Sequence, residues 1–263
     1  MASFLLVGCG NMGGAMLQGW LAGGIAPSCF TVVDPVLAEV PRDVTLLRDL
    51  PQGCFDFILL GVKPQMLDAI APEVAARVGP QTVILSILAG VELASLAARF
   101  PKAAGLVRIM PNLAAAIGKS PVALAAQGLD PAARDEVTAL MRPLGTPEWL
   151  EEPQFDIVTA LAGSGPAFVY RFIDALAAGA ARLGLPREQA DRLALATVEG
   201  AALLAAGSEY SPGELARCVA SPGGTTQAGL DVLDADAALA GLVEATLRAA
   251  RDRGAEMARA ARS

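Results

Sequence analysis

The sequence predicts an α/β fold, in which an N-terminal doubly wound parallel sheet is followed by an all-α C-terminal domain. Three observations lead to this prediction. Short apolar runs alternate with amphipathic stretches in residues 1–152, a glycine-rich turn follows the first run, and residues 153–263 contain no convincing strand. Apolar strands that alternate with helices are typical of a parallel sheet with both faces covered. We therefore expect two domains, residues 1–152 and residues 153–263.

The expected elements of the first domain each have a local reason. Residues 4–7 (FLLV) form an apolar run typical of a buried strand, and a helical stretch follows from about residue 12 to residue 22. Pro64 is placed to start a helix that runs to about residue 78, because proline is favoured at the first helical position. Further strands are expected in four short apolar runs, residues 30–33, 57–60, 83–87 and 106–109.

The second domain is predicted to be a small bundle of Ala- and Leu-rich helices. These are expected at residues 156–183, 187–206, 225–233 and 237–260. Runs of small residues, such as residues 177–181 (AAGAA), let neighbouring helices approach closely. A lobe this small and this apolar is expected to bury one face against a second copy of the chain.

The composition excludes several classes of function. Lys and Arg number 20 against 27 Asp and Glu, so a net charge of −7 provides no basic footprint for nucleic acid or an anionic membrane. The chain has no histidine, which excludes His-dependent nucleophiles and His-based metal sites, and we expect no metal. Lysine occurs only at Lys63, Lys102 and Lys119, which excludes chemistry that needs a lysine in the C-terminal half.

The cysteines and the hydropathy pattern favour a cytoplasmic protein. Cys9, Cys29, Cys54 and Cys218 form no CxxC pair, and we expect them to be small buried hydrophobes in a reducing cytosol. The N-terminal apolar run lacks a basic region and is interrupted at Gly8. Other apolar runs are interrupted well before the ~20 residues that a membrane helix needs.

Residues 8–13 (GCGNMG) form a dinucleotide-binding fingerprint, because they follow the first strand and open the first helix. Gly8 would make the tight turn, Gly10 would let the backbone reach a pyrophosphate, and Gly13 would let helix and strand pack closely. Asn11 and Met12 start the helix, whose N–H groups favour phosphate. The motif predicts a Rossmann-type domain; the alternative is a plain glycine-rich turn.

Asp34 and Lys63 are candidate cofactor ligands at the carboxyl edge of the sheet. Asp34 ends the second strand, 21 residues after Gly13, where an acidic residue binds the adenosine ribose. Its charge would repel a 2′-phosphate and favour NAD(H). The alternatives are an outward turn-forming Asp34, with Arg42 or Arg48 reaching a phosphate, and a solvated loop lysine at Lys63.

Residues 221–226 (SPGGTT) are the most informative motif of the second domain. Ser221 is expected to be a helix N-cap, with Pro222 at the first helical position and helical sequence from about Thr225. Consecutive N–H groups, two glycines and three hydroxyls make a nest that suits a small carboxylate. The alternative is a well-capped helix start that binds nothing.

The chain resembles the pyrroline-5-carboxylate reductases over essentially its whole length. The resemblance is carried by residues 8–13 (GCGNMG), 62–65 (VKPQ), 108–112 (RIMPN), 158–167 (VTALAGSGPA) and 221–230 (SPGGTTQAGL). It implies hydride transfer from NADPH or NADH to 1-pyrroline-5-carboxylate, giving L-proline in the last step of proline biosynthesis. It also implies a dimer, with an active site between one subunit's nucleotide domain and the other's helices, often assembled into a decamer.

The resemblance also implies roles for single residues of the second domain. Ser221, Gly224 and Thr225 would hold the substrate carboxylate. Thr226 would hydrogen-bond the ring nitrogen and is the expected catalytic residue. Glu209 matches, more weakly, a polar position near the substrate in some relatives.

Further matched positions fall in or near the first domain. The resemblance implies that five residues line the cofactor, namely Val62, Lys63, Pro64, Ala89 and Asn112. Ser164 lies in a stretch that we expect to be structural.

Three positions depart from the family pattern. Asp34-Pro35 stands where a pair such as Asn-Arg commonly suits a 2′-phosphate, so the cofactor preference leans to NADH. Leu113-Ala114 replaces the usual Thr-Pro after Asn112, which implies a different local loop. Cys218 and Ala220 replace residues that are usually polar, which weakens a hydrogen bond behind the 221–226 loop.

Two other functions fit parts of the pattern. A reductase of the 3-hydroxyacid or phosphogluconate type shares the plan of a Rossmann domain plus helices, but it uses a lysine in the second domain, where this chain has none. A non-catalytic nucleotide-binding module is the other alternative, and the intact SPGGTT motif argues against it.

Overall fold

The computed structural model describes residues 2–260, and the side chains of residues 2–256, as two compact units. Of the described residues, unit 1 comprises residues 2–163 and 250–260, and unit 2 comprises residues 164–249. The domain boundary predicted at residue 152 stays a prediction. Within the described residues, no helix is long and apolar enough to cross a membrane.

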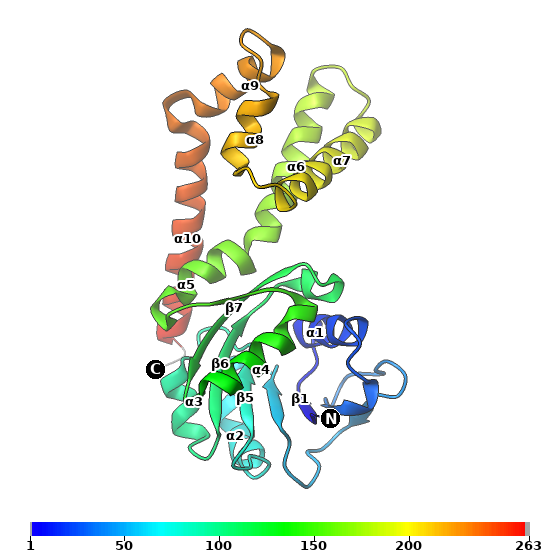
Figure 1. Cartoon of the computed structure of the whole chain (residues 1–263), viewed down its shortest axis with the longest axis vertical. Helices are drawn as coiled ribbons and strands as arrows, with labels where there is room; N and C mark the ends of the chain where they lie inside the picture. The colour runs from blue at the N-terminus through cyan, green and yellow to red at the C-terminus, as the bar shows by residue number, and fades with distance from the viewer. Residues whose placement is uncertain (1, 261–263) are drawn as a thin grey trace. The chain divides into compact units, whose positions relative to one another are not determined.

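Unit 1 contains an eight-stranded sheet in the order β3-β2-β1-β4-β5-β6-β7-β8 (Figure 1). The strands are β1 (Phe4–Val7), β2 (Phe30–Val33), β3 (Thr45–Leu47), β4 (Phe57–Leu60), β5 (Val83–Ser86), β6 (Gly105–Met110), β7 (Ser120–Gln127) and β8 (Gly145–Trp149). Every neighbouring pair is parallel except β6 and β7. The predicted doubly wound sheet is confirmed, with one antiparallel pair, because residues 111–119 are too few for a crossover.

Helices cover both faces of the sheet, as predicted. On one face, α1 (Asn11–Ala22) and α4 (Pro131–Met141) pack against Phe4 and Leu6, and on the other α2 (Leu67–Ala75) and α3 (Leu93–Arg99) pack with Leu5 and Val7. Successive strand residues point to opposite faces, so two covered faces require continuous apolar runs rather than alternation.

Several elements differ from the sequence-based expectations. The strands β3, β7 and β8 and the helices α3, α4 and α8 (Pro212–Val219) are additional. The segment from Pro64 begins with a 3-10 turn, and α2 proper starts at Leu67 and ends at Ala75. The long helix expected at residues 156–183 is interrupted: α5 (Phe155–Val158) and α6 (Gly165–Arg182) flank a π-helical turn, Thr159–Gly163.

The remaining helical elements are short or belong to unit 2. Unit 2 contains α6, α7 (Arg187–Ala206), α8 (Pro212–Val219), α9 (Thr225–Asp234) and the first part of α10 (Ala238–Ala260). The 3-10 turns are Pro27–Cys29, Pro64–Met66, Leu113–Ile117, Arg142–Leu144, Glu152–Gln154 and Ala235–Ala237. Residues 153–260 contain no strand, so the predicted helical character of the described C-terminal part is confirmed.

The core of unit 2 is small. Helices α6 and α7 form a hairpin (Figure 1) and pack through the fully buried Ala177, Ala190 and the nearly buried Ala194. Many larger apolar side chains on its helices stay exposed, among them Tyr170, Leu203, Leu204, Val232 and Leu242. The alanines allow the close approach that the sequence predicts, but they leave most of the apolar surface uncovered.

The cysteines follow the prediction only in part. Cys9 is buried and Cys29 is half-buried, whereas Cys54 and Cys218 are exposed. The prediction was wrong for Cys54, which lies in the loop before β4, and for Cys218, which lies in a helix without buried residues. Burial, with the nearby charge of Asp34, raises the pKa of the Cys9 thiol to about 11, so it stays protonated at neutral pH.

Candidate functional site

The glycine loop after β1 requires glycine at its first position. Gly8 has a φ of +84°, in the left-handed region, and a Cβ placed on it would lie 2.9 Å from backbone atoms of Gly61 and Val62. A Cβ on Gly13 would lie 3.2 Å from the carbonyl oxygen of Gly8. Both glycines therefore permit close backbone approach at the carboxyl end of β1.

Gly10 lies in a different environment. A Cβ on Gly10 would meet no atom within 4 Å, so the protein itself leaves the space beside this residue open. Gly10 is the N-cap of α1 and provides no side-chain cap, and the first turn of α1 carries no acidic residue. The first N–H groups of α1, which starts at Asn11 and Met12, thus suit an anion.

The Asp34 carboxylate is bound by three backbone N–H groups. Oδ2 accepts from Cys9 at 3.0 Å, and Oδ1 accepts from Val36 at 2.9 Å and Leu37 at 3.0 Å. Burial opposes ionisation, but these N–H groups, together with the charge of Arg48, outweigh it and hold the pKa of Asp34 below its usual value. Asp34 therefore carries a fixed negative charge between the glycine loop and the turn after β2.

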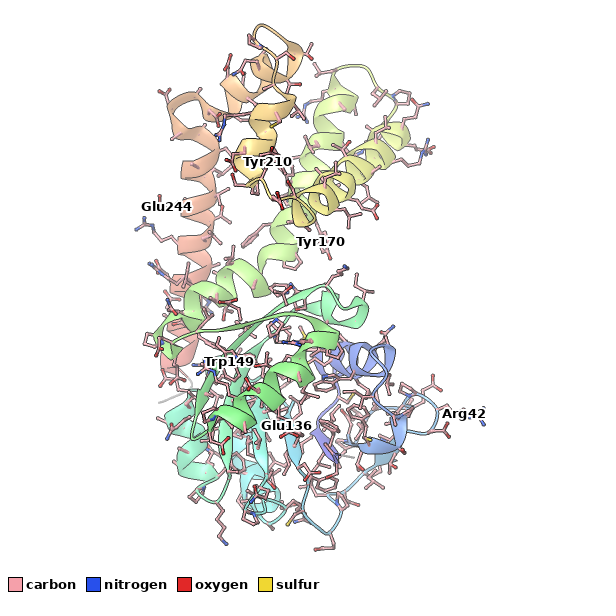
Figure 2. All side chains as sticks on the ribbon, in the orientation of Figure 1. Arg42, Glu136, Trp149, Tyr170, Tyr210 and Glu244 are labelled. Atoms are coloured by element: carbon pink, nitrogen blue, oxygen red, sulfur yellow. The ribbon has the colours of Figure 1, made fainter. Side chains whose placement is uncertain are left out.

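The two arginines near Asp34 are already engaged in other contacts. Arg48 donates from Nη1 to the carbonyl oxygens of Asp34 and Leu37, each over 2.7 Å. Arg42 is 95% exposed, lies 3.8 Å from the Asp43 carboxylate and points away from unit 1 (Figure 2). The Asp34 carboxylate accepts hydrogen bonds from the turn that follows it, as the turn-forming alternative expects. It also accepts one from Cys9 in the glycine loop.

Other predicted residues lie at the same edge of the sheet. Val62, Lys63 and Pro64 follow β4, next to Gly61, and the Lys63 side chain is exposed. A Cβ on Gly61 would lie 2.6 Å from the carbonyl oxygen of Gly8, so this segment touches the glycine loop. Ala89 is exposed in the turn after β5. The structure thus brings these cofactor candidates to one edge of unit 1.

Asn112 is buried at the end of β6 and contacts the protein through both amide atoms. Its Nδ2 donates to the carbonyl oxygen of Ala162 over 3.0 Å, and its Oδ1 accepts from the N–H of Ala114 at 2.9 Å. It thereby caps the 3-10 turn Leu113–Ile117 and holds a carbonyl of the π-helical turn. The loop after Asn112 therefore forms a capped turn without the usual Thr-Pro.

Helix α9 starts at Thr225, as expected, but its N-cap is a different residue from the one predicted. Gly224, and not Ser221, is the N-cap of α9, so the prediction of Ser221 as N-cap was wrong. The reason is Gly223, whose φ of +71° turns the chain, so that Gly224 donates its N–H to the carbonyl oxygen of Ser221 over 2.9 Å. Thr225 and Thr226 are then the first two residues of α9.

The start of α9 suits a small anion. Gly224 provides no side-chain cap, and no acidic residue lies in the first turn. Ser221, Thr225 and Thr226 are exposed in the described chain. Glu209 is also exposed, in the turn between α7 and α8. N–H groups and hydroxyls at a helix start can hold a carboxylate.

Two contacts of unit 1 were not predicted from the sequence, although Arg48 itself was considered as a phosphate ligand. Arg48 closes the turn after Asp34, and Glu152 pairs with the buried Arg108 over 2.7 Å. A single arginine within the apolar run at residues 106–109 is the sequence signal that points to the second contact, because a buried charge needs a partner. The residues described contain no cluster of three or more metal-binding side chains.

Comparison with known proteins gives consistent matches. A family model described as pyrroline-5-carboxylate reductase dimerisation matches residues 152–257. The pyrroline-5-carboxylate reductase of Pseudomonas aeruginosa is 36% identical over 261 residues, which cover 96% of this chain and 95% of that protein. That of Methanosarcina acetivorans is 32% identical over 257 residues, covering 92% and 93%. A solved pyrroline-5-carboxylate reductase from Coxiella burnetii superposes with a TM-score of 0.89 at 29% identity, covering 97% of this chain and 98% of that chain.

Proposed function

The chain belongs to the pyrroline-5-carboxylate reductase family, and from this premise we propose which of its own residues carry the reaction. The enzyme is an NAD(P)H-dependent oxidoreductase that reduces 1-pyrroline-5-carboxylate to L-proline, in the last step of proline biosynthesis. The observation that carries the residue assignment is a pair of uncapped helix starts, that of α1 behind Gly10 and that of α9 behind Gly224.

The glycine loop fits a dinucleotide. Gly8 and Gly13 bring backbone close together, and the open space at Gly10 lets a pyrophosphate reach the N–H groups of Asn11 and Met12. The remaining lining residues are Val62, Lys63, Pro64, Ala89 and Asn112. When bound, the reduced nicotinamide supplies the hydride.

The α9 start fits the substrate. We assign the substrate carboxylate to the backbone N–H groups that follow Gly224 at the start of α9, with the hydroxyls of Ser221 and Thr225 beside them. Thr226, one residue further along the helix, then offers a hydroxyl to the ring nitrogen, with Glu209 as a more distant polar contact. Anchoring the carboxylate fixes which face of the ring is exposed to the hydride.

This chemistry does not need a histidine. The imine nitrogen can be protonated by water, and the Thr226 hydroxyl can stabilise the resulting iminium. The protein then binds the nicotinamide ring and the pyrroline ring and orients them for hydride transfer. The test is oxidation of NADH or NADPH by the purified enzyme, measured with and without 1-pyrroline-5-carboxylate. We expect the cofactor to be oxidised only when the substrate is present. An equal rate of oxidation without the substrate would contradict the proposal.

We predict that the enzyme uses NADH at least as well as NADPH. The Asp34 carboxylate is ionised and held at the end of β2, and a 2′-phosphate brought near it would be repelled. Arg48 keeps its positive charge near Asp34, but its Nη1 is held on two backbone carbonyl oxygens, so we do not assign it to a 2′-phosphate. The measurement is the ratio of catalytic efficiencies for the two cofactors in wild type and in Asp34→Ser, which should shift toward NADPH.

The control for this prediction is Asp49→Ser, which removes an exposed carboxylate from a nearby segment. A ratio taken within one variant cancels any loss of folded protein. A wild type that prefers NADPH by about tenfold or more, roughly 1.4 kcal/mol, would show that Asp34 does not read the ribose.

The chain self-associates through its dimerisation domain, residues 152–257, and we propose that it is a dimer that can assemble into a decamer. The support is the apolar surface of unit 2, where Leu204 is 74% exposed and Val232 is 72% exposed. We predict that light scattering at micromolar concentration will give at least a dimer. A fully active monomer of 26.8 kDa would contradict this. We place the enzyme in the cytoplasm, which the free thiols of Cys9, Cys54 and Cys218 support.

A further inference from the structure

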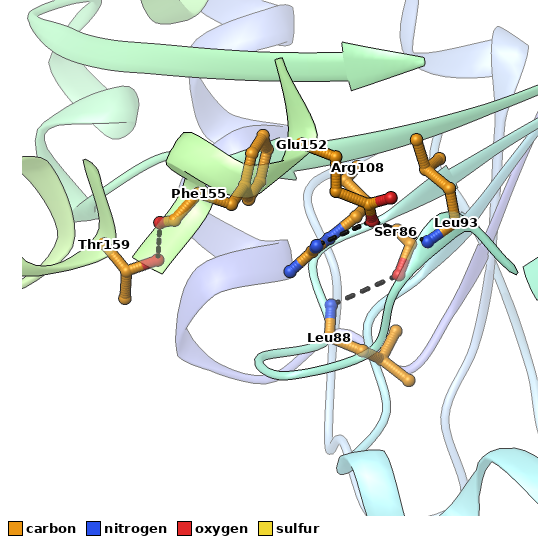
Figure 3. A network of polar contacts seen from close by, with 7 residues as sticks. All are labelled: Ser86, Leu88, Leu93, Arg108, Glu152, Phe155 and Thr159. Carbon is orange, nitrogen blue, oxygen red and sulfur yellow. Dashed lines mark hydrogen bonds and ion pairs between the residues drawn. The ribbon is translucent and has the colours of Figure 1, made fainter. Parts of the chain in front are cut away.

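Arg108 and Glu152 form an ion pair, and neither residue belongs to the proposed cofactor site or substrate site. Arg108 lies within β6 and is paired in register with Ser86 of β5. Its Nη1 donates to Oε1 of Glu152 over 2.7 Å, and its guanidinium carbon lies 4.4 Å from the centre of the Phe155 ring (Figure 3). The Arg108 side chain is 8% exposed. A charge desolvated to this degree needs its counter-charge.

Glu152 makes a second contact, to the start of α3. The same Oε1 accepts a hydrogen bond from the backbone N–H of Leu93 over 2.7 Å, although the two residues are 59 positions apart (Figure 3). Leu93 is the first residue of α3, and its own N-cap residue gives no side-chain cap. Glu152 therefore caps α3 from outside and ties it to the buried charge of Arg108.

The loop that ends at Leu93 carries Ala89. At its near end the loop continues from β5, where the N–H of Ile87 donates to the carbonyl oxygen of Leu60 over 3.2 Å. β4 ends at Leu60, and the next residue, Gly61, touches the glycine loop at Gly8. The loop at residues 87–92 is thus held by the sheet at one end and by Glu152 at the other, beside the edge that carries the cofactor candidates.

We propose that Glu152 is a positioning residue for cofactor binding, which holds the loop at residues 87–92, and with it Ala89, in place by joining Leu93 to Arg108. The proposal rests on the assigned role of Ala89 in lining the cofactor. A carboxylate oxygen suits this task, because it can accept from a guanidinium and from a backbone N–H at the same time. Without it, the far end of the loop keeps the apolar packing of Val91 and Leu93 but loses its polar anchor, and one wall of the cofactor site is less firmly held.

The experiment compares three variants by calorimetric titration of NADH without substrate and by steady-state kinetics. Glu152→Ala should raise the Kd and the KM for NADH about tenfold, or roughly 1.4 kcal/mol, and leave the KM for 1-pyrroline-5-carboxylate unchanged. Glu152→Gln should recover part of the affinity, since its amide oxygen still accepts both hydrogen bonds, although the buried Arg108 loses its counter-charge. Asp68→Ala is the matched control, because it removes the ion pair with Arg99 at the opposite end of α3.

Each outcome decides the proposal. An unchanged Kd for NADH in folded Glu152→Ala would overturn it, and so would an equal loss in Asp68→Ala. If Glu152→Ala does not fold, Glu152→Asp carries the test, because its shorter side chain cannot reach both Leu93 and Arg108, and unchanged affinity there would overturn the proposal. A wild type that binds NADH without reducing 1-pyrroline-5-carboxylate would instead contradict the proposed function, and the binding comparison would still stand.

Discussion

Gly10→Ala is expected to raise the Kd for NADH by about one to two decades while the protein stays folded. The structure leaves the space at Gly10 open, so the added methyl group meets no protein atom and no strain arises. The methyl group instead occupies the path by which a pyrophosphate reaches the start of α1. Losing hydrogen bonds to a charged group costs roughly 1.5–3 kcal/mol, which gives the expected range.

Gly8→Ala is the matched comparison for this prediction. A Cβ there falls 2.9 Å from the backbone of Gly61 and Val62, and the φ of +84° disfavours any side chain. We expect the free energy of unfolding to drop by roughly 2–5 kcal/mol, from left-handed strain and overpacking together. Thermal unfolding separates the two variants. Equal melting temperatures, or normal NADH affinity in Gly10→Ala, would contradict the account of the loop.

Thr226→Ala is expected to lower the catalytic efficiency with 1-pyrroline-5-carboxylate by about one to two decades. The change removes one exposed hydroxyl at the start of α9 and no core volume, so the fold should be unaffected. Loss of a hydrogen bond made in the transition state costs roughly 1–3 kcal/mol. The measurement is kcat/KM for the substrate, together with the Kd for NADH, which should not change.

Thr246→Ala is a suitable control, since its hydroxyl donates to the carbonyl oxygen of Leu242 inside α10 and is far along the chain from the 221–226 loop. Its activity should match wild type. Unchanged catalytic efficiency in Thr226→Ala would remove this residue from the mechanism.

Most of the nucleotide-binding sheet could be predicted because its signals are local. The strands β1, β2, β4, β5 and β6 are predominantly apolar runs, and the glycine loop has its expected place between β1 and α1. The strands that could not be predicted lack such signals. β7 begins with Ser-Pro and is rich in alanine, and the edge strand β8 contains Pro147 and Glu148, which are residues depleted in strands.

The residue types of the candidate site could be predicted from the sequence, but the contacts that these residues make could not. The position of Asp34 after β2 indicated a carboxylate at the sheet edge, whereas its three N–H donors depend on how the glycine loop and the following turn fold together. Helix α9 starts at Thr225 as expected, but its N-cap was misplaced by three residues, because the φ of Gly223 cannot be read from its identity. The π-helical turn at Thr159–Gly163 likewise has no signal in an Ala-rich stretch.

The central claim is that this chain transfers hydride from the nicotinamide ring to C2 of 1-pyrroline-5-carboxylate, the imine carbon that becomes C5 of proline. The most direct test uses NADH carrying deuterium at the transferred position of C4, and analyses the product by mass spectrometry and NMR. The account predicts L-proline with deuterium at C5, in an amount equal to the cofactor oxidised. Unlabelled proline, or cofactor oxidation without proline, would contradict it.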